Sequence, residues 1–183
     1  MKPKIIIAGA GRAGTSFLMR LLTRLGFDTG FTPEADGFNP RIRAGCEKFR
    51  FPPTVEWLET APWILKTPYW CNDLEDAIAV GAPIGHVFIP VRRLDEVAKS
   101  RVAAGLAQSE AKTVAAEEHV MAKWLGRIVA TVVVNGIDFT TMQYPRHVRD
   151  WEYCGEQLAR GLPELRQIEA RKFRYVHKEL STL

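Results

Sequence analysis

Long apolar runs are missing from this sequence of 183 residues. No window approaches the roughly 18 uninterrupted apolar residues that mark a membrane-spanning helix, so we expect no membrane span. The apolar stretch at residues 5–10 ends before Arg12 and is too short for the core of an export signal. We therefore expect a cytoplasmic protein.

Cysteine and histidine are both scarce, with three of the former and four of the latter. Cys46, Cys71 and Cys154 are an odd number and include no C-x-x-C pair, which argues against a disulfide framework and against a zinc site. The histidines have no partner at the spacing of metal ligands. The sequence therefore predicts no metal site.

Charge of one sign is not concentrated anywhere in the chain. The formal net charge is +4, and the lysines and arginines are scattered. A mildly basic protein suits an anionic small ligand as well as a nucleic acid. Charge alone does not choose between these partners.

Apolar residues make up 46% of the chain, which is enough for one core, and we expect a single domain over residues 1–183. Runs rich in β-branched residues predict buried strands at residues 4–9, 63–65, 86–91 and 137–142. Helical spacing of apolar residues predicts helices at residues 15–25, 55–60, 73–80, 94–107, 109–134, 146–160 and 163–172. Strands that alternate with helices indicate an α/β fold, a three-layer sandwich with a mainly parallel sheet.

A glycine-rich turn separates the first predicted strand from the first helix. Residues 9–14 (GAGRAG) satisfy G-x-G-x-x-G, the dinucleotide-binding fingerprint. The same turn also fits a phosphate loop in which Thr15 stands in place of the Walker lysine and Ser16 keeps the hydroxyl position. Both interpretations place backbone N–H groups and a helix N-terminus against an anion.

The two interpretations differ in what should follow the helix. A Rossmann domain, the fold of NAD(P)-binding oxidoreductases, continues with a second strand that ends in an acidic residue. Asp28 stands at about the right distance, but Gly30 and Pro33 interrupt the segment. Arg12 also places a guanidinium where the fingerprint presents small residues, which favours a more concentrated anionic charge. A P-loop kinase of a nucleoside or small molecule would instead need a lysine at position 15 and an acid for Mg²⁺.

A second cationic element follows the third predicted strand. Arg92 stands at the end of that strand, and Ser100 lies eight residues further on, within the next helix. Ligands of open α/β sheets bind at the carboxyl ends of the strands, so this pair would hold a second phosphate. A solvated charged face of the helix is the alternative interpretation.

Taken in order, these elements resemble the sulfotransferase family. Its members transfer a sulfuryl group from 3′-phosphoadenosine 5′-phosphosulfate (PAPS) on a P-loop NTPase-like fold without the Walker lysine. Residues 11–16 resemble the family's 5′-phosphosulfate loop, residues 92–100 its 3′-phosphate motif, and residues 63–68 (WILKTP) its strand followed by K-x-P. The chain departs from the pattern at Ala13, where Ser or Thr is usual, and at Leu94, where proline is common. It is also shorter than typical members.

The resemblance implies a role for each matching residue. The implied cofactor-binding residues are Gly11, Arg12, Ala13, Gly14, Thr15, Ser16, Arg92 and Ser100. Arg12 and Lys66 would supply positive charge around the transferred group. Glu34, with Asp36 in reserve, would take the proton from the acceptor.

The resemblance also implies what the protein works with. The cofactor would be PAPS, the product 3′,5′-ADP, and no metal would be required. The acceptor would be a hydroxyl or amine of a small molecule or glycan, and no nucleic acid would take part. A homodimer stays open, and so does a nucleotide-binding module without catalysis.

Overall fold

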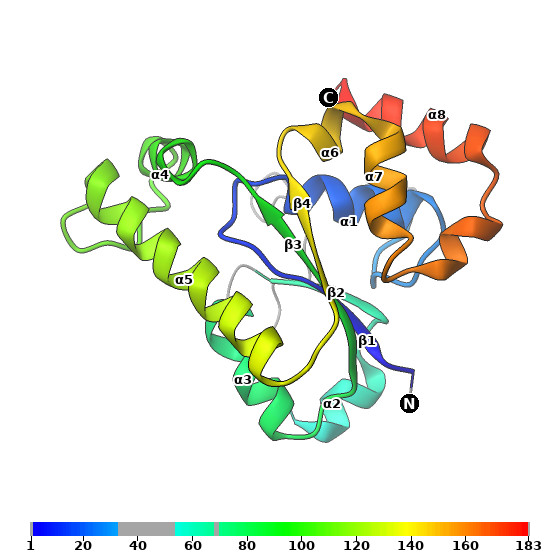
Figure 1. The fold of residues 1–183 in the computed structure, drawn as a ribbon, viewed down its shortest axis with the longest axis horizontal. Coiled ribbons are helices and arrows are strands. Elements are labelled where there is room, and N and C mark those ends of the chain that lie inside the picture. Colours follow the sequence, from blue (N-terminus) through cyan, green and yellow to red (C-terminus); the bar gives the residue numbers. More distant parts are fainter. Residues whose placement is uncertain (1, 33–53, 68–69, 183) are drawn as a thin grey trace.

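The computed structural model describes residues 2–32, 54–67 and 70–182 (Figure 1). Its strands are β1 (Lys4–Ile7), β2 (Ile64–Lys66), β3 (Ile84–Val91) and β4 (Phe139–Gln143). Its helices are α1 (Thr15–Arg24), α2 (Val55–Thr60), α3 (Trp70–Ala79), α4 (Leu94–Ala103), α5 (Val114–Val134), α6 (Arg146–Arg149), α7 (Trp151–Leu158), the 3₁₀ helix η1 (Pro163–Gln167) and α8 (Ala170–Ser181). No helix of this described part is long and apolar enough to cross a membrane.

The strands form one sheet in the order β2-β1-β3-β4, and every pairing is parallel. Ile7, near the end of β1, is in register with Lys66 on one side and with Phe88 on the other. All carboxyl ends of parallel strands lie at the same edge of a sheet. The loop after β1, Lys66 and the residues after β3 therefore meet at one edge, as the sequence predicts.

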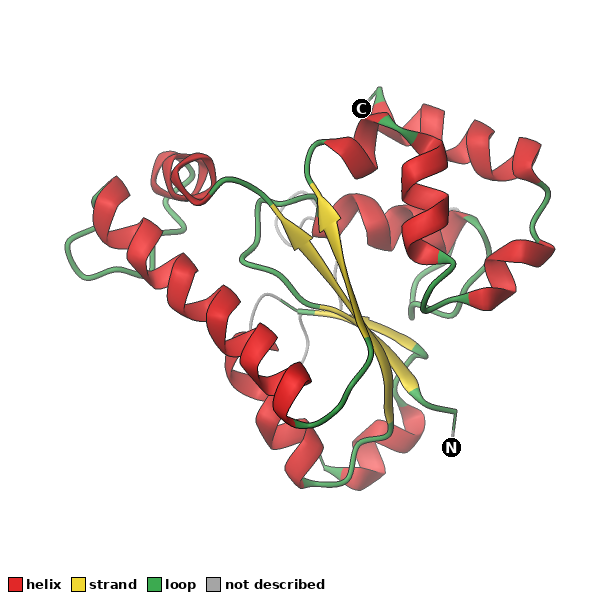
Figure 2. Cartoon of the chain, in the orientation of Figure 1, coloured by secondary structure: helices red, strands yellow, loops and turns green. Residues whose placement is uncertain are grey.

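Helices cover both faces of the sheet, which makes the three layers seen in Figures 1 and 2. Successive side chains of a strand point to opposite faces, and β1 shows this directly. Ile5 and Ile7 pack with α1, α7 and α8, whereas Ile6 and Ala8 pack with α3 and α5. The prediction of an α/β sandwich with a parallel sheet is confirmed.

A smaller apolar cluster lies at the carboxyl edge. Ala10, in the loop after β1, packs against Val97 of α4 and Met121 of α5. In Figure 1, α4 lies beyond the end of β3, and α6 lies beyond the end of β4. The loop is thus attached to helices that follow much later in the sequence.

The prediction of one helix at residues 146–160 is wrong, because the structure has two helices there, α6 and α7. Asp150 adopts an extended conformation (φ −116°, ψ 101°), and its side chain accepts a hydrogen bond from the Tyr153 backbone N–H at 3.0 Å. That is the geometry of a helix N-cap, so α6 ends and α7 begins there. The last predicted helix is likewise replaced by η1 and α8.

Asp28, the candidate ribose ligand of a Rossmann domain, has a different position. Its carbonyl oxygen accepts a hydrogen bond from the Ile64 N–H at 2.9 Å, and its carboxylate accepts one from the Trp63 N–H at 2.9 Å. Both donors stand where β2 begins, at the amino edge of the sheet. Asp28 therefore lies at the edge opposite the glycine loop and fixes the start of a strand.

Candidate functional site

The loop between β1 and α1 has an unusual backbone. Gly11, Arg12 and Gly14 have φ angles of 70°, 56° and 85°. Glycine adopts positive φ without steric penalty, whereas for arginine the left-handed region costs about 1–2 kcal/mol. The loop bends sharply and leads directly into α1.

Side chains of the loop are turned inward. Ala13 is 1% exposed and Thr15 is 6% exposed. The methyl group of Thr15 lies 3.3 Å from where a Cβ would stand at Gly9. Thr15, at the position of the Walker lysine, therefore has a short and buried side chain. The methyl group of Ala13 is buried as well, at the position where Ser or Thr would bury a hydroxyl group.

Helix α1 begins directly after this loop, so its N-terminus lies at the loop. Its N-cap residue, Gly14, has no side chain to accept a hydrogen bond, and the first turn contains no acidic residue. The positive end of a helix dipole favours an anion. No carboxylate of the helix itself competes for that place.

The two cationic motifs meet at the loop. The Arg12 Nε donates a hydrogen bond to the Ser100 Oγ at 2.9 Å, and an Arg92 Nη1 donates to the Arg12 carbonyl oxygen at 3.3 Å. Residues 12 and 100 are 88 positions apart in the sequence. The structure thus brings together Arg12, Arg92 and Ser100.

Arg92 is held from two further sides. Its Nε donates to a carboxylate oxygen of Glu96 at 2.8 Å, and its guanidinium lies 4.8 Å from the centre of the Tyr144 ring. Contact with an aromatic face and with a carboxylate restricts the side chain. These contacts within the protein orient Arg92 toward the loop.

Lys66 lies next to the loop, at the end of β2. It is in register with Ile7, two residues before Gly9, and is 6% exposed. Lys66 therefore ends its strand at the same edge of the sheet as the loop that carries Arg12. Glu34 and Asp36, the predicted bases, lie outside the described residues.

Asp73, on the first turn of α3, is a further titratable residue near Lys66 in the sequence. It is 8% exposed, and its Oδ2 makes no hydrogen bond within the part of the chain that the structure describes. Burial, helped by the negative charge of Asp76, raises the pKa of Asp73 to about 6. A carboxyl group with that pKa can exchange protons near neutral pH.

Arg101, which the sequence did not single out, lies beside the loop. Its Nη1 is 3.2 Å from where a Cβ would stand at Gly11. Its Nε donates to the Glu117 carboxylate at 2.5 Å and its Nη2 to the Leu106 carbonyl at 2.7 Å. A buried guanidinium thus contacts the loop from the side of α4 and α5.

His147 contacts the loop from the opposite side, and no sequence motif marked it as a site residue. It is fully buried, and its Nε2 would overlap a Cβ placed at Gly14. Its Nδ1 lies 3.1 Å from the Gln143 carbonyl oxygen, which can only accept, so Nδ1 carries the proton. Within the described residues Nε2 has no hydrogen-bond partner. Only a glycine at position 14 leaves room for this ring.

Among the described residues, no group of three or more His, Cys, Asp or Glu side chains is placed to hold a metal ion.

Replacing Gly14 with alanine tests the contact with His147. The positive φ alone predicts a loss of about 1–2 kcal/mol in the free energy of unfolding, and the overlap with the ring adds to it. Gly26→Ala is a matched control, because Gly26 has a φ of 92° and a Cβ at this position would meet nothing within 4 Å. In urea unfolding, Gly14→Ala should be clearly the less stable of the two variants. Equal losses would show that His147 does not restrict position 14.

The buried His147 also predicts a dependence of stability on pH. Burial lowers the pKa of His147 from 6.5 to about 4. Between pH 6.5 and pH 4 the unfolded chain therefore binds a proton at His147 that the folded chain does not bind. The contribution of His147 to the free energy of unfolding is present above pH 6.5 and is lost as the pH falls toward 4. Between pH 7 and pH 5 the loss from this group is about 2 kcal/mol.

His147→Asn removes the titration but keeps a donor for the Gln143 carbonyl. Urea unfolding at pH 7 and pH 5 should show a smaller drop for this variant than for the unaltered protein. His86 and His177, whose pKa values burial also lowers, titrate in both proteins. An equal drop in the two proteins would contradict the assignment.

No protein-family model matches the chain, and no curated protein matches it in sequence. Among solved structures it is similar to the sulfotransferase STF1 from Mycobacterium tuberculosis H37Rv, with a TM-score of 0.58. The two are 14% identical, over 97% of this chain and 71% of the other. At that identity the likeness shows the fold alone: this chain has a sulfotransferase-like α/β fold with a parallel sheet flanked by helices.

Proposed function

We propose that this protein is a sulfotransferase that moves a sulfuryl group from PAPS to a hydroxyl or amine of a small molecule or glycan in the cytoplasm. The observation that carries the proposal is the meeting of two cationic motifs at one glycine loop. Arg12 reaches Ser100, and Arg92 reaches the backbone of Arg12. Two adjacent cationic centres fit a nucleotide with two separate anionic groups.

In this proposal each end of PAPS has its own residues. The backbone of residues 11–16 and the N-terminus of α1 hold the 5′-phosphosulfate. Arg92 and Ser100 hold the 3′-phosphate. The contact of Ser100 with Arg12 opens when the 3′-phosphate takes the hydroxyl.

The transfer itself is an in-line displacement at sulfur. The acceptor oxygen or nitrogen forms a bond to sulfur while the bond from sulfur to the 5′-phosphate oxygen breaks. The leaving electron pair stays on the phosphate of 3′,5′-ADP, and the acceptor proton passes to a base. Arg12 and Lys66 stabilise the negative charge on the transferred and leaving oxygens, which is the main electrostatic task in this type of transfer.

The competing functions fit this geometry less well. A P-loop kinase needs a lysine at position 15, where Thr15 is short and buried, and the residue after β3 is Arg92 rather than an acid for Mg²⁺. A Rossmann oxidoreductase needs an acid beside the loop, whereas Asp28 lies at the other edge of the sheet. A nucleotide-binding module without catalysis would bind PAPS but not turn it over.

Calorimetry with 3′,5′-ADP, ATP·Mg and NADH in parallel tests the proposal. We expect 3′,5′-ADP to bind most tightly. A preference for either of the other two nucleotides would overturn the assignment.

Arg92→Ala tests the second phosphate. Loss of a charge-assisted hydrogen bond should weaken 3′,5′-ADP by about 2–3 kcal/mol and leave 5′-AMP nearly unchanged. Arg93→Ala is the matched control, because Arg93 has the same charge but its side chain is 76% exposed and pairs with Asp95. Equal losses for both nucleotides in Arg92→Ala would remove Arg92 from the 3′ site.

Glu34→Gln tests the base, which the sequence alone proposes. The variant should lower turnover by about 10²–10⁴-fold, the usual contribution of a general base, and should leave the affinity for 3′,5′-ADP unchanged. Asp73→Asn tests in the same way a buried carboxyl group, among the described residues, that can exchange a proton near neutral pH. Undiminished turnover in Glu34→Gln would exclude Glu34.

A further inference from the structure

We infer that Arg101 is a third arginine of the anion site and donates a hydrogen bond from Nη1 to the group that the glycine loop binds. The naming of that group as the 5′-phosphosulfate rests on the proposed function. The inference that an anion binds there does not rest on the proposed function, because it is drawn from the loop and from Arg101 alone.

The free end of the Arg101 guanidinium points at the loop. Nη1 lies 3.2 Å from where a Cβ would stand at Gly11, whose φ is +70°. The other two nitrogens are engaged by Glu117 and by the Leu106 carbonyl. Within the described part of the chain, Nη1 is the one nitrogen of this guanidinium for which no hydrogen bond is found.

Glu117 fixes the guanidinium in place. It is fully buried, one carboxylate oxygen accepts from Arg101, and the other accepts from the backbone N–H groups of Gln108 and Ser109 at 2.8 and 3.0 Å. Burial alone would raise the pKa of Glu117, but these hydrogen bonds outweigh it and hold the pKa below its usual value. The pair is therefore ionised.

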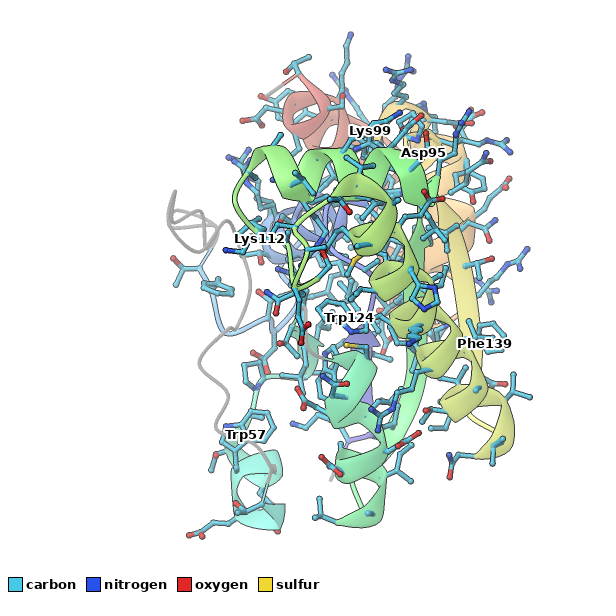
Figure 3. All side chains as sticks on the ribbon, turned by 90° about the vertical axis from the view of Figure 1, so that its left-hand side faces the viewer. Trp57, Asp95, Lys99, Lys112, Trp124 and Phe139 are labelled. Carbon is cyan, nitrogen blue, oxygen red and sulfur yellow. The ribbon has the colours of Figure 1, made fainter. Side chains whose placement is uncertain are left out.

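Trp124 of α5 restricts Arg101 further. The guanidinium carbon lies 5.4 Å from the centre of the Trp124 ring, and Figure 3 shows Trp124 at the middle of the molecule below α4. Arg101 as a whole is 6% exposed. A donor that is already oriented needs no rearrangement when an anion arrives, which strengthens its interaction with it.

Several cationic side chains gather around the loop. The guanidinium groups of Arg92 and Arg101 contact the loop, and Arg12 of the loop itself carries a third. Glu96 pairs with Arg92 and Glu117 with Arg101. Asp95 on α4 pairs with Lys99 at 3.4 Å and also with Arg93 at 3.1 Å, and Figure 3 labels Asp95 and Lys99 on that helix. Several guanidinium groups gathered at one loop are a suitable environment for a compact anion.

The position of Arg101 separates its role from that of Arg92. Arg101 lies against Gly11 within the loop, whereas Arg92 and Ser100 form the second centre. In the proposed function the loop holds the 5′ group. Arg101 should therefore act on every ligand with a 5′-phosphate and not on one that has only a 3′-phosphate.

Calorimetry of Arg101→Gln and Arg101→Lys with four probes tests this inference. Affinity for 5′-AMP, 3′,5′-ADP and inorganic pyrophosphate should fall at least about tenfold in Arg101→Gln, as expected for a lost charge-assisted hydrogen bond. Affinity for 3′-AMP should change by less than about twofold, because 3′-AMP has no 5′ group. Arg101→Lys keeps the charge but cannot reach Glu117, Leu106 and the anion together, and it should show a smaller loss with the same selectivity.

Glu117→Gln is the control for packing, since it disturbs the same buried pair but keeps the guanidinium. It should lower the unfolding temperature at least as much as Arg101→Gln while losing less affinity for 5′-AMP. A similar loss for all four probes, or none, would show that Arg101 is structural and would overturn the inference. If the unaltered protein binds pyrophosphate but not 3′,5′-ADP, the proposed function fails and Arg101 is judged on pyrophosphate alone. Binding of none of the probes overturns both.

Discussion

The close approach of two buried side chains to the glycines after β1 is the constraint on which the carboxyl edge of the sheet depends. Gly11 admits the Nη1 of Arg101 from one side, and Gly14 admits the ring of His147 from the other. Both glycines also have a positive φ, so a side chain at either position is disfavoured by the backbone as well as by the close neighbour. The loop therefore fixes where α4 and α6 lie, although they belong to distant parts of the chain.

Arg12 shows how local strain is compensated at this edge. Its left-handed backbone is unfavourable for a residue with a side chain. The hydrogen bonds of its carbonyl with Arg92 and of its Nε with Ser100 stabilise this conformation from outside the loop. The same contacts place a guanidinium beside the N-terminus of α1. A conformation that costs energy and is held by distant residues is typical of functional sites rather than of ordinary turns.

Much of the fold was readable from the sequence because its signals are local. The β-branched runs, the glycine turn and the helical spacing of Leu18, Leu21 and Leu22 each depend on a few neighbouring residues. The parallel sheet then follows from the alternation of strands and helices. The direct hydrogen bond of Arg12 with Ser100 was not predicted, because the sequence placed these two residues at separate phosphates.

Arg101 and His147 lay beyond such reasoning. Arg101 stands directly after Ser100 in a helix rich in charges, and nothing in the sequence separates a buried arginine from a solvated one. Its burial depends on Glu117, which is 16 residues away across a loop. His147 lies on the single-turn helix α6, far from Gly14 along the chain, so its contact with Gly14 is not visible in the local sequence. Both are tertiary contacts. They distinguish Arg101 from the other arginines and His147 from the other histidines, which the sequence alone does not.

The buried polar residues around the loop are not explained by stability. Replacing a buried ion pair with apolar residues of similar volume is often neutral or stabilising. A buried ring nitrogen is unfavourable when it makes no hydrogen bond, and none is found for the Nε2 of His147 among the described residues. Yet both kinds of group contact the same loop, through Arg101 with Glu117 and through His147. An apolar core would bury the loop equally well but would not orient a guanidinium at Gly11. The arrangement fits the inferred anion site, in which the sheet and its helices provide the rigid support that the placement of charge needs.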